Sequence, residues 1–105
     1  MFSLFKKKYD SISAAELSEK LSMVNLIDVR ENYEFRSGHV PKARNIPMSA
    51  ILAEPEKYLH KDKEYHIICH SGSRSSGTCR RLSALGYKVV NVSGGTMSYT
   101  KPLKR

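Results

Sequence analysis

The sequence has no tryptophan and only two cysteines among its 105 residues. Two cysteines cannot form a disulfide framework, so we expect a reducing compartment, namely the cytoplasm. The sequence also lacks any apolar run that approaches the roughly 20 residues needed to cross a membrane. Its first residues place apolar side chains before lysines, which is the reverse of a secretory signal. We therefore predict a cytoplasmic protein with no membrane segment.

Acidic residues are scarce, because 10 Asp and Glu stand against 18 Lys and Arg, a net charge of +8. Part of the excess lies at the two ends, in Lys6–Lys8 and in Lys101, Lys104 and Arg105. Such basic tails are usually solvated, and no basic stripe interleaved with aromatic residues suggests base stacking. We expect no nucleic-acid binding, whereas the positive field would attract small anions.

The composition, 40% hydrophobic and 27% charged, fits one small globular domain. No internal repeat or long linker interrupts the chain. We expect a single monomeric domain over residues 1–105, with its core at about 9–99 between the basic tails. Four scattered histidines and two cysteines show no spacing typical of metal ligands, so no metal site is predicted.

Apolar periodicity and turn residues predict strands that alternate with helices. Ser13–Glu16 has the capping-box pattern and opens a helix with Leu17 and Leu21 on one face. Further helices are predicted at 31–37 (ending at Gly38), 49–59 (broken at Pro55) and 75–85 (ending at Gly86). Strands are predicted at 23–29, 65–68 and 87–92, with an extended piece near 43–46.

This alternation indicates an α/β fold with a mostly parallel sheet. Ligands of such sheets bind beyond the carboxyl ends of the strands, and Cys69 follows a strand at such an end. In the helix predicted over residues 75–85, the side chains expected to face the interior are Thr78, Cys79, Leu82 and Leu85.

Residues 69–77, CHSGSRSSG, consist mostly of small polar residues directly after a buried strand. The N–H groups of Ser71–Arg74 can converge on one point, where the next helix also directs its positive end. Arg74 adds a full charge. We expect the pKa of the Cys69 thiol to fall from about 8.5 into the range of roughly 3.5–7.5 found for activated cysteines. The alternative is a buried core cysteine before a turn.

CHSGSRS resembles the active-site loop of the rhodanese homology domain. Three more stretches are similar to motifs of that family in order and spacing: Asp28-Val-Arg30 with Glu34-Phe35, residues 38–47 (GHVPKARNIP), and residues 86–89 (GYKV) with 93–95 (SGG). The resemblance covers roughly Tyr9 to Tyr99 and implies a three-layer α/β fold around a five-stranded, mainly parallel sheet. Tyr99 stands where the family has tryptophan, and Lys42 where it usually has glycine.

The resemblance implies a sulfurtransferase that needs no metal or organic cofactor. Cys69 would take sulfur from a small anionic, thiosulfate-like donor, hold it as a persulfide, and pass it to cyanide, a thiol or a protein acceptor. The loop residues that would bind the donor are His70, Ser71, Gly72, Ser73 and Arg74. The C-x4-R spacing is similar to that of sulfurtransferases, whereas phosphatases and arsenate reductases of this fold have a loop one residue longer.

Three charged residues are expected to support the loop rather than bind substrate. Because buried charges need partners, we predict that Asp28 holds loop N–H groups and that Arg30 pairs with Glu34. His39 is expected to make a structural hydrogen bond. Cys79 is expected to fill the core rather than to resolve an intermediate on Cys69.

Two functions are compatible with these residues. The first is an enzyme that transfers sulfur from thiosulfate-type donors through a Cys69 persulfide. The second is a persulfide carrier or regulatory interaction module, loaded by a partner protein and poorly active on free thiosulfate. Both need the same nucleophile, so the sequence alone does not separate them.

Overall fold

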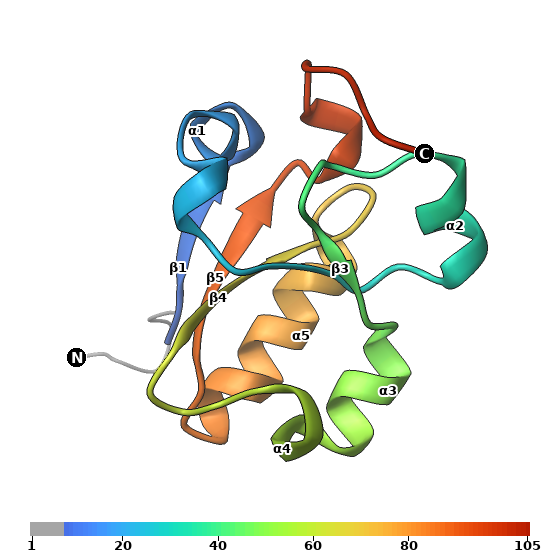
Figure 1. The fold of residues 1–105 in the computed structure, drawn as a ribbon. Coiled ribbons are helices and arrows are strands. Elements are labelled where there is room, and N and C mark those ends of the chain that lie inside the picture. Colours follow the sequence, from blue (N-terminus) through green and yellow to red (C-terminus); the bar gives the residue numbers. More distant parts are fainter. Residues whose placement is uncertain (1–7) are drawn as a thin grey trace.

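A computed structural model describes residues 8–105, and its centre is a five-stranded sheet in which every strand pairing is parallel (Figure 1). The strands lie in the order β1-β5-β4-β2-β3. Their bounds are β1 Asp10–Ser13, β2 Leu26–Asp28, β3 Arg44–Asn45, β4 Glu64–Ile68 and β5 Lys88–Ser93. The predicted α/β fold with a five-stranded parallel sheet is confirmed.

Within residues 8–105, five α-helices and two short 3-10 helices accompany the strands. The α-helices are α1 Ala14–Glu19, α2 Asn32–Ser37, α3 Met48–Ala53, α4 Pro55–Tyr58 and α5 Ser73–Ala84. The 3-10 helices are η2 Leu21–Met23 and η3 Thr96–Ser98. Pro55 opens α4 and so divides the predicted helix of residues 49–59 into α3 and α4, because proline suits the first turn of a helix but not its interior.

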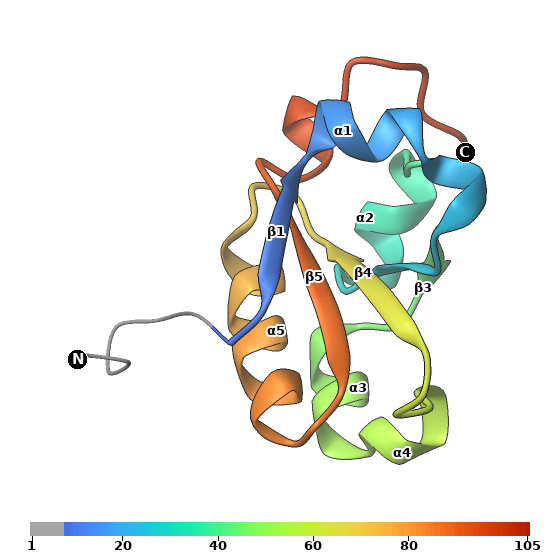
Figure 2. The same cartoon turned by 90° about the vertical axis from the view of Figure 1, so that its left-hand side faces the viewer.

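The sheet is covered on both faces, which gives the three layers of the fold (Figure 2). Successive side chains of a strand point to opposite faces, so Ile67 joins one apolar cluster and Ile68 the other. The first cluster contains residues of α3 and α5, and the second contains Leu17 of α1. Burial on both faces explains why four successive residues of β4, 65–68, are all buried.

The start of α1 is as predicted, because the Ser13 hydroxyl accepts a hydrogen bond from the Glu16 N–H at 3.0 Å. Leu17 is fully buried, while Leu21 lies beyond the helix in η2 and packs at the edge of the second cluster. The strand β1, which precedes α1, was not predicted by the pattern. Its four residues lie at the sheet edge and are mostly exposed, so they carry no apolar run.

Helix α5 begins at Ser73, two residues before the predicted start, and ends at Ala84. Thr78, Cys79 and Leu82 are buried as predicted, but the prediction for Leu85 is wrong, since that residue is 53% exposed. It follows the last helical residue, where the chain turns away from the core. Gly86 has φ +96°, and its N–H donates to Ser83, which closes the helix with the left-handed residue expected there.

The C-terminal residues lie against the segment that follows α2 (Figure 1). Lys104 forms an antiparallel bridge with His39, with N–H···O distances of 2.9 and 2.8 Å, and Leu103 lies over Gly38. The C-terminal basic segment is therefore hydrogen-bonded to the chain beside α2, while Lys6 and Lys7 of the N-terminal basic tail lie outside the described residues. Among residues 8–105, no helix has the length and apolar character needed to traverse a bilayer.

Candidate active site

Cys69 is the first residue after β4, a strand with neighbours on both sides, and its sulfur is almost completely buried. Two backbone N–H groups donate to Sγ, from Gly72 at 3.1 Å and from Ser75 at 3.3 Å. The thiol itself donates to the Ser75 hydroxyl at 3.4 Å, and that hydroxyl donates to the Gly72 carbonyl at 3.1 Å. Three groups therefore surround one sulfur atom at the carboxyl end of the sheet.

Ser75 is a site residue that the sequence analysis missed. The predicted ring of donors was Ser71–Arg74, but only Gly72 of these donates to the sulfur. Because α5 begins two residues early, Ser75 lies in its first turn, where backbone N–H groups lack partners within the helix. These N–H groups and the positive end of a 12-residue helix favour negative charge on the sulfur.

Gly72 gives the loop its tight turn. It has φ +110°, a left-handed conformation that side chains disfavour, and an added Cβ would lie 3.1 Å from the Gly94 nitrogen. His70, Ser71 and Ser73 of the same loop are exposed. The loop thus has a small, closed interior and a polar rim.

The Arg74 guanidinium is paired with the Glu34 carboxylate and is therefore not a free cation in the loop. Its two terminal nitrogens donate to the two carboxylate oxygens at 2.8 and 2.9 Å. The hydrogen bond from Arg74 is the main reason that the pKa of Glu34 is lowered to about 2. Glu34 likewise raises the pKa of Arg74, and the nearby Cys69 adds a smaller contribution in the same direction.

Asp28 and Arg30 form a second, buried ion pair at the end of β2. Arg30 donates to the Asp28 carboxylate from Nη2 at 2.8 Å and from its own backbone N–H at 2.9 Å. It also donates to the Gly38 carbonyl at 2.8 Å. Asp28 therefore accepts from the N–H of Arg30, in the segment after β2, and not from the Cys69 loop that it was expected to support. The predicted pairing of Arg30 with Glu34 is also wrong. The Asp28 carboxylate, two residues earlier in the chain, pairs with Arg30. Glu34 is therefore available to pair with Arg74.

The Gly94-Gly95 turn holds the other side of the Cys69 loop, a role that the sequence analysis did not assign to it. The N–H groups of Thr96 and Met97 donate to the carbonyls of Cys69 and His70, at 2.9 and 3.0 Å. Gly95 lies so close that a Cβ there would collide with both carbonyls. The segment after β5 thus fixes the backbone of the nucleophile.

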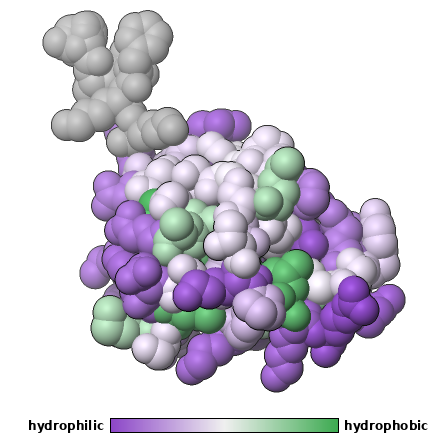
Figure 3. All heavy atoms as spheres, turned by 90° about the horizontal axis from the view of Figure 1, so that it is seen from above, coloured by the Kyte–Doolittle hydropathy of each residue, from purple (hydrophilic) through white to green (hydrophobic). Residues whose placement is uncertain are grey.

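A groove of about 440 Å3 opens beside this loop. Its walls include Glu34, His70 and Thr96 together with the exposed side chains of Tyr33, Met97 and Leu103. On the face that contains the carboxyl ends of the strands, hydrophobic residues form small groups among hydrophilic ones (Figure 3). A ligand approaching Cys69 from this groove would meet a rim that is partly apolar and partly polar.

Cys79 and His39 have the structural roles that were predicted. Cys79 is fully buried in α5, and burial raises the pKa of its thiol to about 12, with Cys69 adding a smaller contribution. His39 Nδ1 lies 2.9 Å from the Phe35 carbonyl, and the His39 ring stacks on that of Phe35. Among residues 8–105, no three His, Cys, Asp or Glu side chains are grouped so that they could hold a metal ion.

The chain belongs to the rhodanese-like domain family, whose model matches residues 13–102. "Putative sulfurtransferase YtwF" of Bacillus subtilis (strain 168) is 48% identical over 99 residues, covering 87% of this chain and 93% of that protein. "Putative sulfur carrier protein YrkF" of the same organism is 34% identical over 97 residues, covering 91% of this chain and 47% of that protein. The crystal structure of a rhodanese-related protein from Thermoplasma volcanium is 39% identical with a TM-score of 0.83, and the match covers 91% of this chain and 98% of that one.

Proposed function

We propose that this protein transfers sulfane sulfur through a persulfide on Cys69. The observation that carries the proposal is the Cys69 sulfur itself, held by the Gly72 and Ser75 N–H groups at the amino end of α5. Family membership and the sulfurtransferase name of a 48% identical relative support the same chemistry.

The proposed first half-reaction uses a thiosulfate-like donor. The Cys69 thiolate attacks the outer sulfur of thiosulfate and forms a new S–S bond, while the S–S bond of thiosulfate breaks and its electron pair leaves with sulfite. Cys69 then carries a persulfide with one negative charge. The charge of this persulfide lies on its outer sulfur. The N–H groups that donate to Sγ stabilise the Cys69 thiolate, which attacks the donor and is restored when the outer sulfur leaves, since preorganised donors act strongly in a buried site.

In the second half-reaction an acceptor nucleophile removes the outer sulfur. Cyanide attacks that atom and leaves as thiocyanate, and the electron pair of the broken S–S bond returns to Cys69 as thiolate. A thiolate acceptor would leave as a persulfide in the same way. No net oxidation occurs over the two steps, so the cycle needs no external oxidant or reductant.

Loop size supports a sulfur donor over a phosphate ester. The C-x4-R loop is one residue shorter than that of the phosphatases with this fold, so we expect little depth above Cys69. A tetrahedral phosphate would have to bring its central atom within attack distance of the thiolate. The attacked sulfur of thiosulfate projects from its anion and needs less depth. We therefore expect neither phosphatase nor arsenate reductase activity.

A persulfide carrier is the second candidate, and the exposed side chains of Tyr33, Met97 and Leu103 favour it. An apolar rim beside a nucleophile suits contact with a partner protein more than with an inorganic anion. The sulfur-carrier name of the relative YrkF is consistent with this candidate.

Steady-state assay of purified protein with thiosulfate and cyanide tests the enzyme against the carrier. The enzyme produces thiocyanate with many turnovers, and intact mass shows one added sulfur atom after thiosulfate alone. The carrier gains sulfur only from a persulfidated protein donor and turns over thiosulfate poorly. Protein that gains no sulfur from either source contradicts both candidates.

A further inference from the structure

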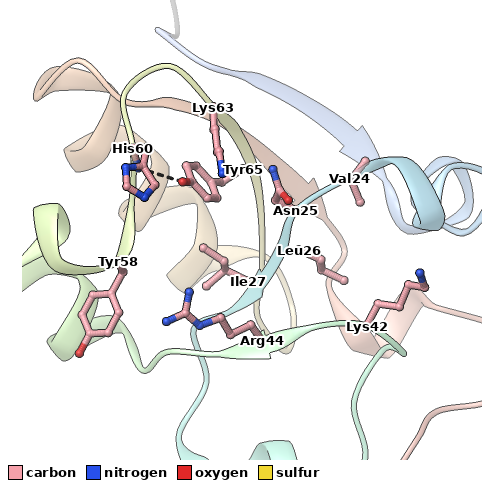
Figure 4. Close-up of a pocket in the computed structure, with 10 residues that line it drawn as sticks. All are labelled: Val24, Asn25, Leu26, Ile27, Lys42, Arg44, Tyr58, His60, Lys63 and Tyr65. Atoms are coloured by element: carbon pink, nitrogen blue, oxygen red, sulfur yellow. Dashed lines mark hydrogen bonds between the residues drawn. The ribbon is translucent and has the colours of Figure 1, made fainter.

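A second concave site lies away from the Cys69 loop, where β2 and β4 begin (Figure 4). It encloses about 340 Å3, which is within the range of small-molecule sites. Its walls carry the cationic side chains of Lys42, Arg44 and Lys63 together with His60, and no carboxylate lines it. The site is therefore small, positively charged and remote from the proposed nucleophile.

The cations come from the starts of β3 and β4, the two strands that flank β2. Lys42 lies in the turn that precedes β3, Arg44 is the first residue of β3, and the side chains of both residues line the site. Figure 4 shows Arg44 and Lys63 extending towards the space beside Ile27 and Tyr65, with Lys42 next to Leu26.

The positive charge of this site is not neutralised within the described chain. None of the three ion pairs formed by residues 8–105 includes Lys42, Arg44 or Lys63. The Arg44 guanidinium instead lies 5.8 Å from the centre of the Tyr58 ring, a contact that leaves its charge intact. Clustered like charges repel one another, so an anion bound among them would be stabilised by all of them.

Lys42 has a backbone conformation that stability alone would not select. Its φ of +74° is the only positive value at a residue other than glycine between residues 8 and 105. The turn closes with a hydrogen bond from the Ala43 N–H to the Val40 carbonyl at 3.1 Å, and Pro41 precedes Lys42. This is the turn position at which glycine is favoured, so lysine is strained there. The strained residue is also the one that brings its ammonium group to the site.

We propose that Lys42, Arg44, His60 and Lys63 form a binding site for a small anion that carries phosphate or carboxylate groups. This proposal goes beyond sulfur transfer and does not depend on it, because no residue of the Cys69 loop takes part. The volume limits the ligand to a small molecule, and the aromatic rings of Tyr58 and Tyr65 offer surface for an apolar or planar part of it.

The test is an NMR titration of the full 15N-labelled chain with inorganic phosphate, pyrophosphate and citrate at constant ionic strength. We expect saturable shifts of amides in residues 24–27, 42–44 and 60–65, with pyrophosphate or citrate as the tighter ligand according to which group the site prefers. Arg44→Gln and Lys63→Gln should each weaken binding roughly tenfold. Lys101→Gln, an equal loss of charge on an exposed residue elsewhere, should leave the affinity unchanged.

Lys42→Gly gives the sharpest readout, because its two expected effects have opposite signs. Removing the strain should raise the thermal midpoint, while removing the ammonium group should weaken anion binding several-fold. Cys69→Ala should bind the anion as the unsubstituted protein does, which separates this site from the proposed sulfur chemistry.

Three results would overturn the proposal. One is the absence of saturable shifts in these segments with all three anions. Another is a loss of affinity in Lys101→Gln equal to that in Arg44→Gln. The third is binding of an oligoglutamate peptide at these residues with no binding of the small anions.

Discussion

Arg74 and Glu34 are forty residues apart in the chain and form a two-point ion pair beside the Cys69 loop. The pair ties the first turn of α5 to α2, which has no buried residues of its own. It also directs the positive charge of the loop arginine to a carboxylate. The arginine that the sequence places in the loop thus has a partner before any donor arrives.

This ion pair should make stability depend on pH in the acid range. The pKa of Glu34 is lowered from 4.5 to about 2, chiefly by the Arg74 hydrogen bond, so the folded state favours the ionised carboxylate. The stabilisation is complete above about pH 4.5 and is lost as the pH falls towards 2. Because both side chains are partly exposed, we expect the ion pair to contribute about 1 kcal/mol to the free energy of unfolding.

Urea denaturation of Glu34→Gln at about pH 6 and about pH 2 measures that contribution. The variant should lose stability at the higher pH and differ little from the unsubstituted protein at the lower one. Glu19→Gln, at an exposed glutamate outside the described ion pairs, serves as the control. Equal effects of the two substitutions would contradict the assignment.

Substitution of Arg74 should impair sulfur transfer from thiosulfate. We expect Arg74→Ala to lower kcat/KM by an amount equivalent to roughly 2–4 kcal/mol, since it removes a cation beside a doubly charged donor. Arg74→Lys should recover only part of the lost kcat/KM, because an ammonium group lacks the planar geometry by which Arg74 donates two hydrogen bonds to Glu34. The thiosulfate:cyanide assay checks both values.

Glu34→Gln tells two roles of Arg74 apart in the same assay. If Arg74 acts on the donor through its charge, Glu34→Gln should retain more activity than Arg74→Ala. If Arg74 only holds the loop, the two variants should lose activity equally. Full activity in both Arg74 variants would show that backbone groups alone bind the donor.

Cys79→Ser should cost stability and leave sulfur transfer intact. Its thiol is fully buried and, with a pKa of about 12, stays protonated near neutral pH, so it is a poor nucleophile. A serine hydroxyl buried there without a partner should cost about 1–3 kcal/mol, as measured by urea denaturation. A well-folded Cys79→Ser protein with no transferase activity would assign this residue to the chemistry after all.

Gly95→Ala should damage both the fold and the loop. Gly95 has φ +61°, and the added methyl group would collide with the Cys69 and His70 carbonyls. We expect the free energy of unfolding to fall by about 2 kcal/mol or more, and the turnover of sulfur transfer to fall as well. Gly77→Ala is the matched control, since its new Cβ would only touch Met48 and Arg80 at 3.8 and 3.9 Å, and it should stabilise α5 by about 0.5–1 kcal/mol. Unchanged thermal midpoint and turnover in Gly95→Ala would contradict the role given to this turn.

Local signals were sufficient to predict the central strands and the place of Cys69, whereas the number of five strands came from the family resemblance. Residues 65–68 form an apolar run that ends in small polar residues, and a parallel strand buried on both faces produces that pattern. The edge strand β1 lacked such a signal because it is short and mostly exposed. Its pairing with β5 joins segments about eighty residues apart, as in the Asp10–Val90 register.

The errors at the site came from three-dimensional contacts that no local pattern encodes. Two arginines and two carboxylates allow more than one pairing, and only the fold decides that Arg30 takes Asp28. Ser75 was missed because a local pattern fixes a helix boundary only to within one or two residues, and the earlier start of α5 brings the Ser75 N–H to the sulfur. The constraint on Gly95 arises from carbonyls about twenty-five residues earlier in the chain.

The central claim is that Cys69 carries the transferred sulfur. Peptide mass mapping of the protein after incubation with thiosulfate, in the absence of an acceptor, tests it most directly. The account predicts one extra sulfur atom on the peptide that contains Cys69 and none on the peptide that contains Cys79. Cyanide should then remove that sulfur and release an equal amount of thiocyanate, and Cys69→Ala should take up no sulfur while keeping its fold. Sulfur found on Cys79, or thiocyanate formed at an undiminished rate by Cys69→Ala, would contradict the account.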